Sequence, residues 1–260
     1  MAKLGSPLYI LRNECSRDLM SVLEKLAEIG FEGIEFFGLF GHKPSSIRRK
    51  LDSCGISAIG DHVPVSFNDF TENIDEILEE HLEIGCKFIS LGASEADYFP
   101  AESDYKRTLE TLERTGETAN KSGITLLYHN HANELRDFFN GKNMLENILD
   151  DTNPTLLYPE FDLGWMQIGG ADPMYFLDKY KNRCPVIHFK DYIPLENDDF
   201  LFRPTGYGIV NNAELYLKSA SFDTKPEWYV LDHDCAYERD IYFDMKISLE
   251  YFKNLIKVSQ

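Results

Sequence analysis

Residues 29–36 read IGFEGIEF, and a glycine followed by a short apolar run returns in CGISAIG (54–60), IGCKFISLG (84–92) and SGITLLYH (122–129). Each glycine comes after a segment whose apolar residues recur with helical spacing, so it is placed where helices stop. The run that follows has the length and composition of a buried strand. The pattern is typical of the helix–strand joints of an alternating α/β chain.

Eight such strands can be found along the chain. They begin near Leu8, Gly33, Ile56, Lys87, Ile124, Leu156, Pro185 and Trp228. Helical periodicity covers residues 16–29 (with Ser16 as N-cap), 45–54, a stretch ending before Gly85, and residues 104–120, 144–149, 173–180 and 244–256. No GxGxxG turn follows the first strand, which argues against an open doubly wound sheet. We therefore predict an α/β protein with a single (β/α)8 TIM barrel domain over residues 1–260.

The composition limits the choice of partner. The chain of 260 residues has a formal net charge of −18 at pH 7, whereas nucleic-acid and anionic-membrane binding need clustered lysine and arginine. The longest apolar runs are far below the ~20 residues of a membrane span, and the N-terminus lacks the apolar core of a signal peptide. The five cysteines have no CxxC spacing, so reduced thiols are expected. These features predict a cytoplasmic protein with a small-molecule partner, no nucleic acid and no membrane.

Four of the expected strands end in residues that can bind a metal. They are LLYHNH (126–131), LLYPEFD (156–162), VIHFKD (186–191) and WYVLDHD (228–234). Buried imidazoles and carboxylates are costly unless they are paired or bind a metal. Clusters delivered by successive strands to the C-terminal end of a parallel barrel therefore indicate a catalytic divalent-metal site. His62 ends another strand, whereas His42 and His81 fall in a loop and on a helix and look like surface or satisfied polar positions.

Strand alternation narrows the roles, because residues i and i+2 face the same way. His129 shares a face with His131, Glu160 with Asp162, and Asp232 with Asp234. Carboxylates combined with imidazoles suit Mn²⁺, Co²⁺, Mg²⁺ or Zn²⁺, and the lack of cysteine in the set argues against a structural zinc site.

These segments together resemble the sugar phosphate isomerase/epimerase superfamily, the xylose isomerase-like TIM barrels that include inosose dehydratases. The resemblance runs along nearly the whole chain and is strongest in YHNH (128–131), EFDLGWMQIGGADP (160–173), IHFKDY (187–192), GYGIVN (206–211) and YVLDHD (229–234). The family usually places a divalent metal on a Glu, an Asp, a His and a final Glu. Asp162 and His188 match the second and third ligands, but His129 and Asp232 stand where Glu is usual.

The resemblance implies a ligand set of His129, Asp162, His188 and Asp232, with Glu160 and His131 as acid–base residues. His129 as the base, with His131 or Glu160 on the metal, is an alternative. Substrate contacts are expected from His62, Trp165, Lys190, Glu134 and Asp234. Instead of contacting the substrate, Lys190 could form an ion pair with Asp162 or Asp232. Glu134 is a less favoured candidate for the acid–base role.

Two further features concern the surroundings of the site. Asp191 is expected to orient a loop or a ligand histidine. The polar and aromatic stretch 198–212 is a candidate lid or partner contact, in which Arg203 would meet an anionic substrate. No glycine-rich phosphate cradle is visible, which favours a neutral polyol or keto-sugar.

The sequence thus predicts a metal-dependent sugar isomerase or epimerase that abstracts a proton next to a carbonyl. A dehydratase of a keto-inositol or keto-sugar shares the same intermediate and is the alternative. A non-catalytic sugar-binding barrel is a third possibility, and the charge argues against an endonuclease. Homo-oligomers are common in such families.

Overall fold

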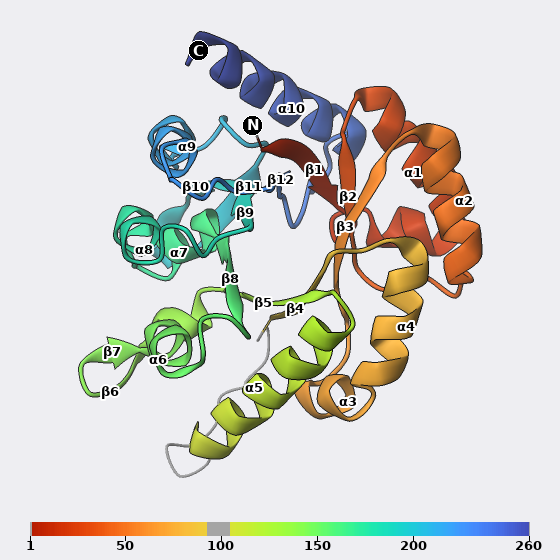
Figure 1. The fold of residues 1–260 in the computed structure, drawn as a ribbon. Coiled ribbons are helices and arrows are strands. Elements are labelled where there is room, and N and C mark those ends of the chain that lie inside the picture. The colour runs from red at the N-terminus through yellow and green to blue at the C-terminus, as the bar shows by residue number, and fades with distance from the viewer. Residues whose placement is uncertain (1, 93–104, 260) are drawn as a thin grey trace.

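The structure is a computed structural model that describes residues 2–92 and 105–259. Eight parallel strands close into a barrel in the order β1-β12-β9-β8-β5-β4-β3-β2, with the helices outside them (Figure 1). The strands are β1 (Lys3–Pro7), β2 (Gly33–Phe36), β3 (Ser57–His62), β4 (Phe88–Gly92), β5 (Thr125–His129), β8 (Tyr158–Asp162), β9 (Val186–Phe189) and β12 (Trp228–Leu231). The predicted TIM barrel is confirmed.

Most helices follow the predicted segments, but those over residues 67–72, 163–168 and 212–220 were not predicted. The helices are α1 (Arg12–Ile29), α2 (Pro44–Cys54), α3 (Phe67–Glu72), α4 (Ile74–Ile84), α5 (Tyr105–Lys121), α6 (Met144–Asp151), α7 (Leu163–Ile168), α8 (Pro173–Lys179), α9 (Asn212–Ala220) and α10 (Ile241–Val258). The glycines after α1, α2 and α4 have positive φ, and their backbone N–H groups donate to carbonyls of the last helical turn, as predicted for helix stops. Asp104, the predicted start of the fourth helix, lies outside the described residues.

Two predictions at the N-terminus are wrong. The first strand ends at Pro7 instead of beginning near Leu8, because the apolar run from Leu8 to Leu11 is a turn that buries Leu8, Ile10 and Leu11 and leaves Tyr9 exposed. Ser16 is not an N-cap: α1 begins at Arg12, and the Ser16 hydroxyl donates to the Arg12 carbonyl within the helix.

The barrel interior holds a small apolar cluster below the polar strand ends. It consists of Ile59, Phe88, Leu127, Val186, Trp228 and Val230. Gly33 makes room for the indole, because a Cβ there would lie 2.5 Å from the Trp228 ring. The larger core lies between the strands and the outer helices. The polar site therefore rests on a packed apolar floor.

A bulge in β3 decides which of its side chains enter the barrel. Ile34 of β2 pairs with Ala58, but Glu35 pairs with Gly60, so two residues of β3 oppose one of β2. Ile59 faces the interior, and the extra residue lets His62 face the cavity at the top of the barrel. Bulges re-aim side chains in this way near active sites.

The segment after β9 contains more regular structure than predicted. Strands β10 (Asp191–Pro194) and β11 (Phe200–Arg203) form an antiparallel hairpin, with a 3-10 turn between them (Glu196–Asp198). Asp191 accepts hydrogen bonds from the backbone N–H groups of Gly206 and Val210 at 2.9 and 3.0 Å. It therefore orients the following loop, one of the two roles predicted for it. A second small hairpin, β6 (Asp137–Phe139) and β7 (Lys142–Asn143), precedes α6 after a 3-10 turn (Asn133–Leu135).

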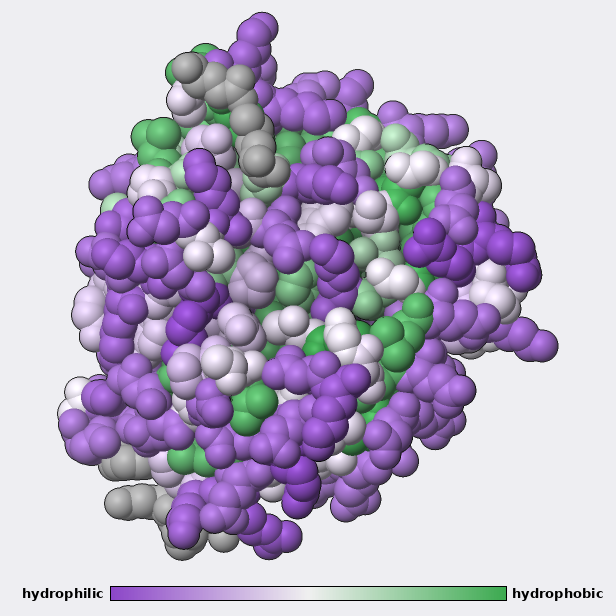
Figure 2. Space-filling model, viewed as in Figure 1, coloured by the Kyte–Doolittle hydropathy of each residue, from purple (hydrophilic) through white to green (hydrophobic). Residues whose placement is uncertain are grey.

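Polar side chains cover most of the face seen in Figure 2, with small apolar patches between them. Over the described ranges, no helix combines the length and apolar character needed to cross a membrane.

Candidate active site at the C-terminal ends of the strands

A cavity of about 550 Å³ opens at the C-terminal ends of the barrel strands. Its lining comes from most of the strands and the loops that follow them: Pro7, Tyr9, Glu35, Phe36, Phe37, His62, His129, His131, Ala132, Asn133, Trp165, His188, Lys190, Phe200, Asp232 and Asp234. Such cavities at this end of a TIM barrel hold the active site.

The four residues predicted as metal ligands lie together, and three of them, His129, His188 and Asp232, line the cavity. His129, Asp162, His188 and Asp232 are all buried, and one ligand atom from each lies within 4.8 Å of the other three. They come from β5, β8 and the ends of β9 and β12. Two imidazoles and two carboxylates are a donor set that divalent metals accept, so the residues present fit such an ion.

Glu35 of β2 is a site residue that the sequence analysis missed. Its Oε2 lies 3.0 Å from Nε2 of His188, and the carboxyl is 3% exposed. Burial and the negative charge of Glu160 raise the pKa of Glu35 to about 8. The available signal was a single acid in the apolar strand GIEF, on the same face as Gly33.

His188 lies between two carboxylates. Its Nδ1 is 3.1 Å from Oδ2 of Asp232, while Nε2 faces Glu35. Burial by itself would lower the pKa of His188, but these carboxylates raise it well above its usual value. The imidazole is therefore oriented through both ring nitrogens.

Three neighbouring imidazoles, those of His62, His129 and His131, form one wall of the cavity. The ring centroid of His129 lies 5.0 Å from that of His62 and 4.9 Å from that of His131. Burial lowers the pKa values of His62 and His129 well below the usual value, so both are neutral at pH 7. Nδ1 of His131 is buried and lies 3.8 Å from Oε1 of Glu134.

Glu160 and Glu134 lie behind this wall and do not line the cavity. Glu160 Oε2 is 3.2 Å from Nδ1 of His129, and burial raises the pKa of the carboxyl. Glu134 accepts a hydrogen bond from the His131 backbone N–H at 3.0 Å. Both acids are therefore in contact with histidines of the wall.

Lys190 has a buried ammonium group held by three aspartates. Its Nζ lies 2.9 Å from Asp162, 3.0 Å from Asp232 and 2.6 Å from Asp234. Burial by itself would lower the pKa of Lys190, but the three carboxylates raise it well above its usual value. Lys190 and His188 in turn hold the pKa of Asp232 well below its usual range, against the effect of burial.

Aromatic side chains flank the mouth of the cavity. Tyr9 and Phe37 make an edge-to-face pair at 4.9 Å, and Trp165 packs edge-on against Phe200 at 5.8 Å. Trp165 also donates from Nε1 to Oδ2 of Asp234 at 3.1 Å. Aromatic faces of this kind pack against the apolar faces of sugar rings.

Two residues near the site in the sequence do not line the cavity. His233 lies between Asp232 and Asp234, on the opposite face of the chain as alternation predicts, and packs beside Arg239 and Asp244; burial lowers its pKa to about 4. Arg203 does not line the cavity; its guanidinium donates to the Phe202 carbonyl.

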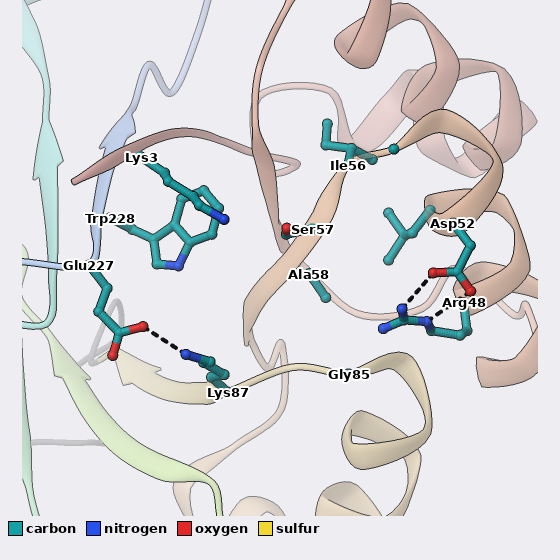
Figure 3. Close-up of a pocket in the computed structure, with 12 residues that line it drawn as sticks. Lys3, Arg48, Asp52, Ile56, Ser57, Ala58, Gly85, Lys87, Glu227 and Trp228 are labelled. Carbon is teal, nitrogen blue, oxygen red and sulfur yellow. Dashed lines mark hydrogen bonds and ion pairs between the residues drawn. The ribbon is translucent and has the colours of Figure 1, made fainter. Parts of the chain in front are cut away.

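A second cavity, of about 610 Å³, lies at the opposite end of the barrel (Figure 3). It is lined by residues at the N-terminal ends of strands, including Lys3, Ser57, Lys87 and Trp228. Lys87 forms an exposed ion pair with Glu227 at 3.0 Å. This end of a TIM barrel serves stability, and the polar clusters described above are all at the other end.

The comparison with known proteins agrees with this geometry. A family model described as "Xylose isomerase-like TIM barrel" matches residues 23–218. The chain belongs to this family. The resemblance seen in the sequence motifs is thereby confirmed.

Among curated members of this group, an inosose dehydratase of Geobacillus kaustophilus is 25% identical over 90% of this chain and 86% of its own length. A sugar phosphate isomerase/epimerase from Parabacteroides distasonis superposes with a TM-score of 0.78 at 23% identity, over 97% of this chain and 94% of its own. A 3-keto-D-glucoside 4-epimerase from E. coli superposes with a TM-score of 0.74 at 15% identity, over 98% and 100% of the two chains. The two structural matches show the shared fold.

Proposed function

We propose that this protein is a divalent-metal-dependent enzyme that removes a proton next to a carbonyl of an uncharged keto-sugar or cyclitol, as an isomerase or epimerase. The observation that carries the proposal is the convergence of His129, Asp162, His188 and Asp232 within 4.8 Å, with all but Asp162 lining a sugar-sized cavity. A metal held there supplies a Lewis acid that polarises a substrate carbonyl.

The acid–base work is assigned to the histidine wall. His131 lines the cavity, and Oε1 of Glu134 lies 3.8 Å behind its Nδ1, so His131 is the residue assigned to take a substrate proton. Glu160 contacts Nδ1 of His129 from behind the wall and holds that imidazole in position. Glu134 accepts a hydrogen bond from the His131 backbone N–H and holds that residue in position.

The other lining residues favour an uncharged substrate. Among the described residues that line the cavity, Lys190 is the only lysine or arginine, and three carboxylates already neutralise it. A phosphate group would meet no free cation there. Sugar hydroxyls find donors and acceptors in His62 and Asp234, and a ring face can pack on Trp165.

Dehydration is the second candidate, and the inosose dehydratase relative favours it. Proton removal next to a carbonyl is the common first step. Return of the proton gives an isomer or epimer, whereas loss of a β-hydroxyl gives a dehydrated product.

The test is a screen of keto-inositols, ketoses and 3-keto-sugars with Mn²⁺ or Co²⁺ in D₂O, followed by NMR. Deuterium uptake without elimination identifies an isomerase or epimerase, and loss of water identifies a dehydratase. EDTA, Asp162→Asn and His188→Ala should each abolish turnover, while Asp178→Asn on the surface of α8 should not. Full activity of Asp162→Asn and His188→Ala would refute the assigned site, and binding without exchange would indicate a non-catalytic sugar-binding barrel.

A further inference from the structure

Lys190 occupies the space between two of the proposed metal ligands. Its Nζ touches Oδ2 of Asp162 at 2.9 Å and Oδ2 of Asp232 at 3.0 Å. The side chain is 1% exposed, so water does not screen this contact. A lysine ammonium and a divalent cation would thus bind the same carboxylate oxygens.

The packing around Lys190 holds the ammonium at this position. The backbone of Gly164 packs directly against Lys190, because a Cβ on Gly164 would lie 2.7 Å from the Cβ of Lys190. The rings of Trp165 and Phe202 lie 5.2 and 5.4 Å from Nζ, within cation–π range. Gly164 therefore packs against the lysine stem, and the two rings lie beside its ammonium.

Asp234 gives the ammonium a partner outside the proposed ligand set. Its Oδ1 lies 2.6 Å from Nζ, and its Oδ2 accepts from the Trp165 indole at 3.1 Å. Asp234 is thus fixed by a second hydrogen bond, independently of Asp162 and Asp232. Lys190 can lose its contacts with those two aspartates and remain paired.

We propose that Lys190 is an internal cation that competes with the metal for Asp162 and Asp232 and so sets the affinity of the site. This inference rests on the metal site of the proposed function. In the metal-free protein Lys190 neutralises the aspartates, which would otherwise repel one another at the cavity floor. Metal entry requires the ammonium to give up both oxygens and keep Asp234, so the metal is bound weakly and exchanges readily.

The test measures Mn²⁺ affinity by equilibrium dialysis, with no need for a substrate. Lys190→Met and Lys190→Gln remove the competing charge and should lower the Kd about tenfold or more. Lys190→Arg keeps the charge and should give no gain. Lys179→Met is the matched control: Lys179 also pairs with two acids, Glu146 and Asp150, but on the outer surface, and its loss should leave the Kd unchanged.

The outcomes separate this inference from the proposed function. If wild type and Lys190→Met bind Mn²⁺ equally, and His188→Ala abolishes binding in both, the metal site stands and competition by Lys190 is refuted. If neither protein binds Mn²⁺, the metal site fails and the inference fails with it. If Lys190→Met binds Mn²⁺ and the wild type does not, the result supports competition by Lys190.

Urea unfolding of each metal-free variant checks that it is folded before dialysis. Equal Kd values for wild type and for folded Lys190→Met and Lys190→Gln would overturn the proposal.

Discussion

Glu35 Oε2 lies 3.0 Å from Nε2 of His188, so an acid on β2 holds a histidine on β9 from across the barrel. A histidine that binds a metal through one ring nitrogen usually donates from the other to a carboxylate. The opposite nitrogen of His188 faces Asp232 at 3.1 Å. Glu35 is therefore placed to fix the orientation of this imidazole.

Glu35→Gln should weaken both activity and Mn²⁺ affinity by about 10- to 100-fold, the usual cost of losing such a partner. The amide keeps the size of the side chain but cannot ionise. Equilibrium dialysis and turnover measure the two effects, with Glu28→Gln on the exposed end of α1 as the control. A fall in activity with unchanged metal affinity would show that Glu35 acts on the substrate instead of on His188.

Phe200→Ala should raise KM about tenfold and leave kcat nearly unchanged. Phe200 comes from the β10–β11 hairpin, lines the cavity and packs on Trp165. Removing a ring contact of this kind costs on the order of 1.5 kcal/mol of binding. Steady-state kinetics on the substrate found in the screen measures this, with the exposed Phe243→Ala as the control. An unchanged KM would mean that the hairpin does not contact the substrate.

The buried pair of Asp61 and His81 should make stability depend on pH. His81 Nε2 lies 2.8 Å from Asp61, and Nδ1 lies 2.6 Å from the Ile77 carbonyl, so both nitrogens face acceptors. Burial alone would lower the pKa of His81, but Asp61 raises it overall. The stabilisation is then complete below the unfolded pKa of ~6.5 and is lost as the pH rises through the higher folded pKa.

His81→Gln tests this dependence. It should reduce the free energy of unfolding by ~3 kcal/mol at pH 5.5, because Asp61 loses its charged partner, and by clearly less at pH 9. Urea unfolding at the two pH values gives the difference, and His42→Gln in the loop before α2 serves as the control. A loss that is equal at both pH values would show that His81 is not charged in the folded protein.

Gly208→Ala should destabilise the protein by about 1–3 kcal/mol through overpacking. A Cβ at this position would lie 2.2 Å from Oδ1 of Asp191 and 2.3 Å from the Tyr192 carbonyl oxygen. It would therefore push away the carboxylate that holds the loop between β11 and α9. Urea unfolding and limited proteolysis measure the effect. The neighbouring exposed Ile209→Ala is the control, and equal stability of the two variants would contradict the role of Asp191.

Much of the site could be predicted from the sequence because it depends on local pattern. His129, Asp162, His188 and Asp232 each follow an apolar run, and parallel strands bring their C-terminal ends to the same end of a barrel. The structure places these four side chains together. Glu35 was missed because a single acid in a four-residue strand carries no motif, and only the distance to His188 shows what it contacts.

The sequence by itself determined the barrel, because glycine stops and strand-length apolar runs are local signals that each βα unit repeats. Only the tertiary structure decided the direction of the side chains at the cavity. Strict alternation from the inward-facing Ile59 would turn Asp61 inward and His62 outward, but the bulge in β3 reverses both. Asp61 therefore pairs with His81 outside the barrel, and His62 reaches the cavity. The position of Lys190 between Asp162 and Asp232 was likewise decided by packing between strands that lie far apart in the sequence.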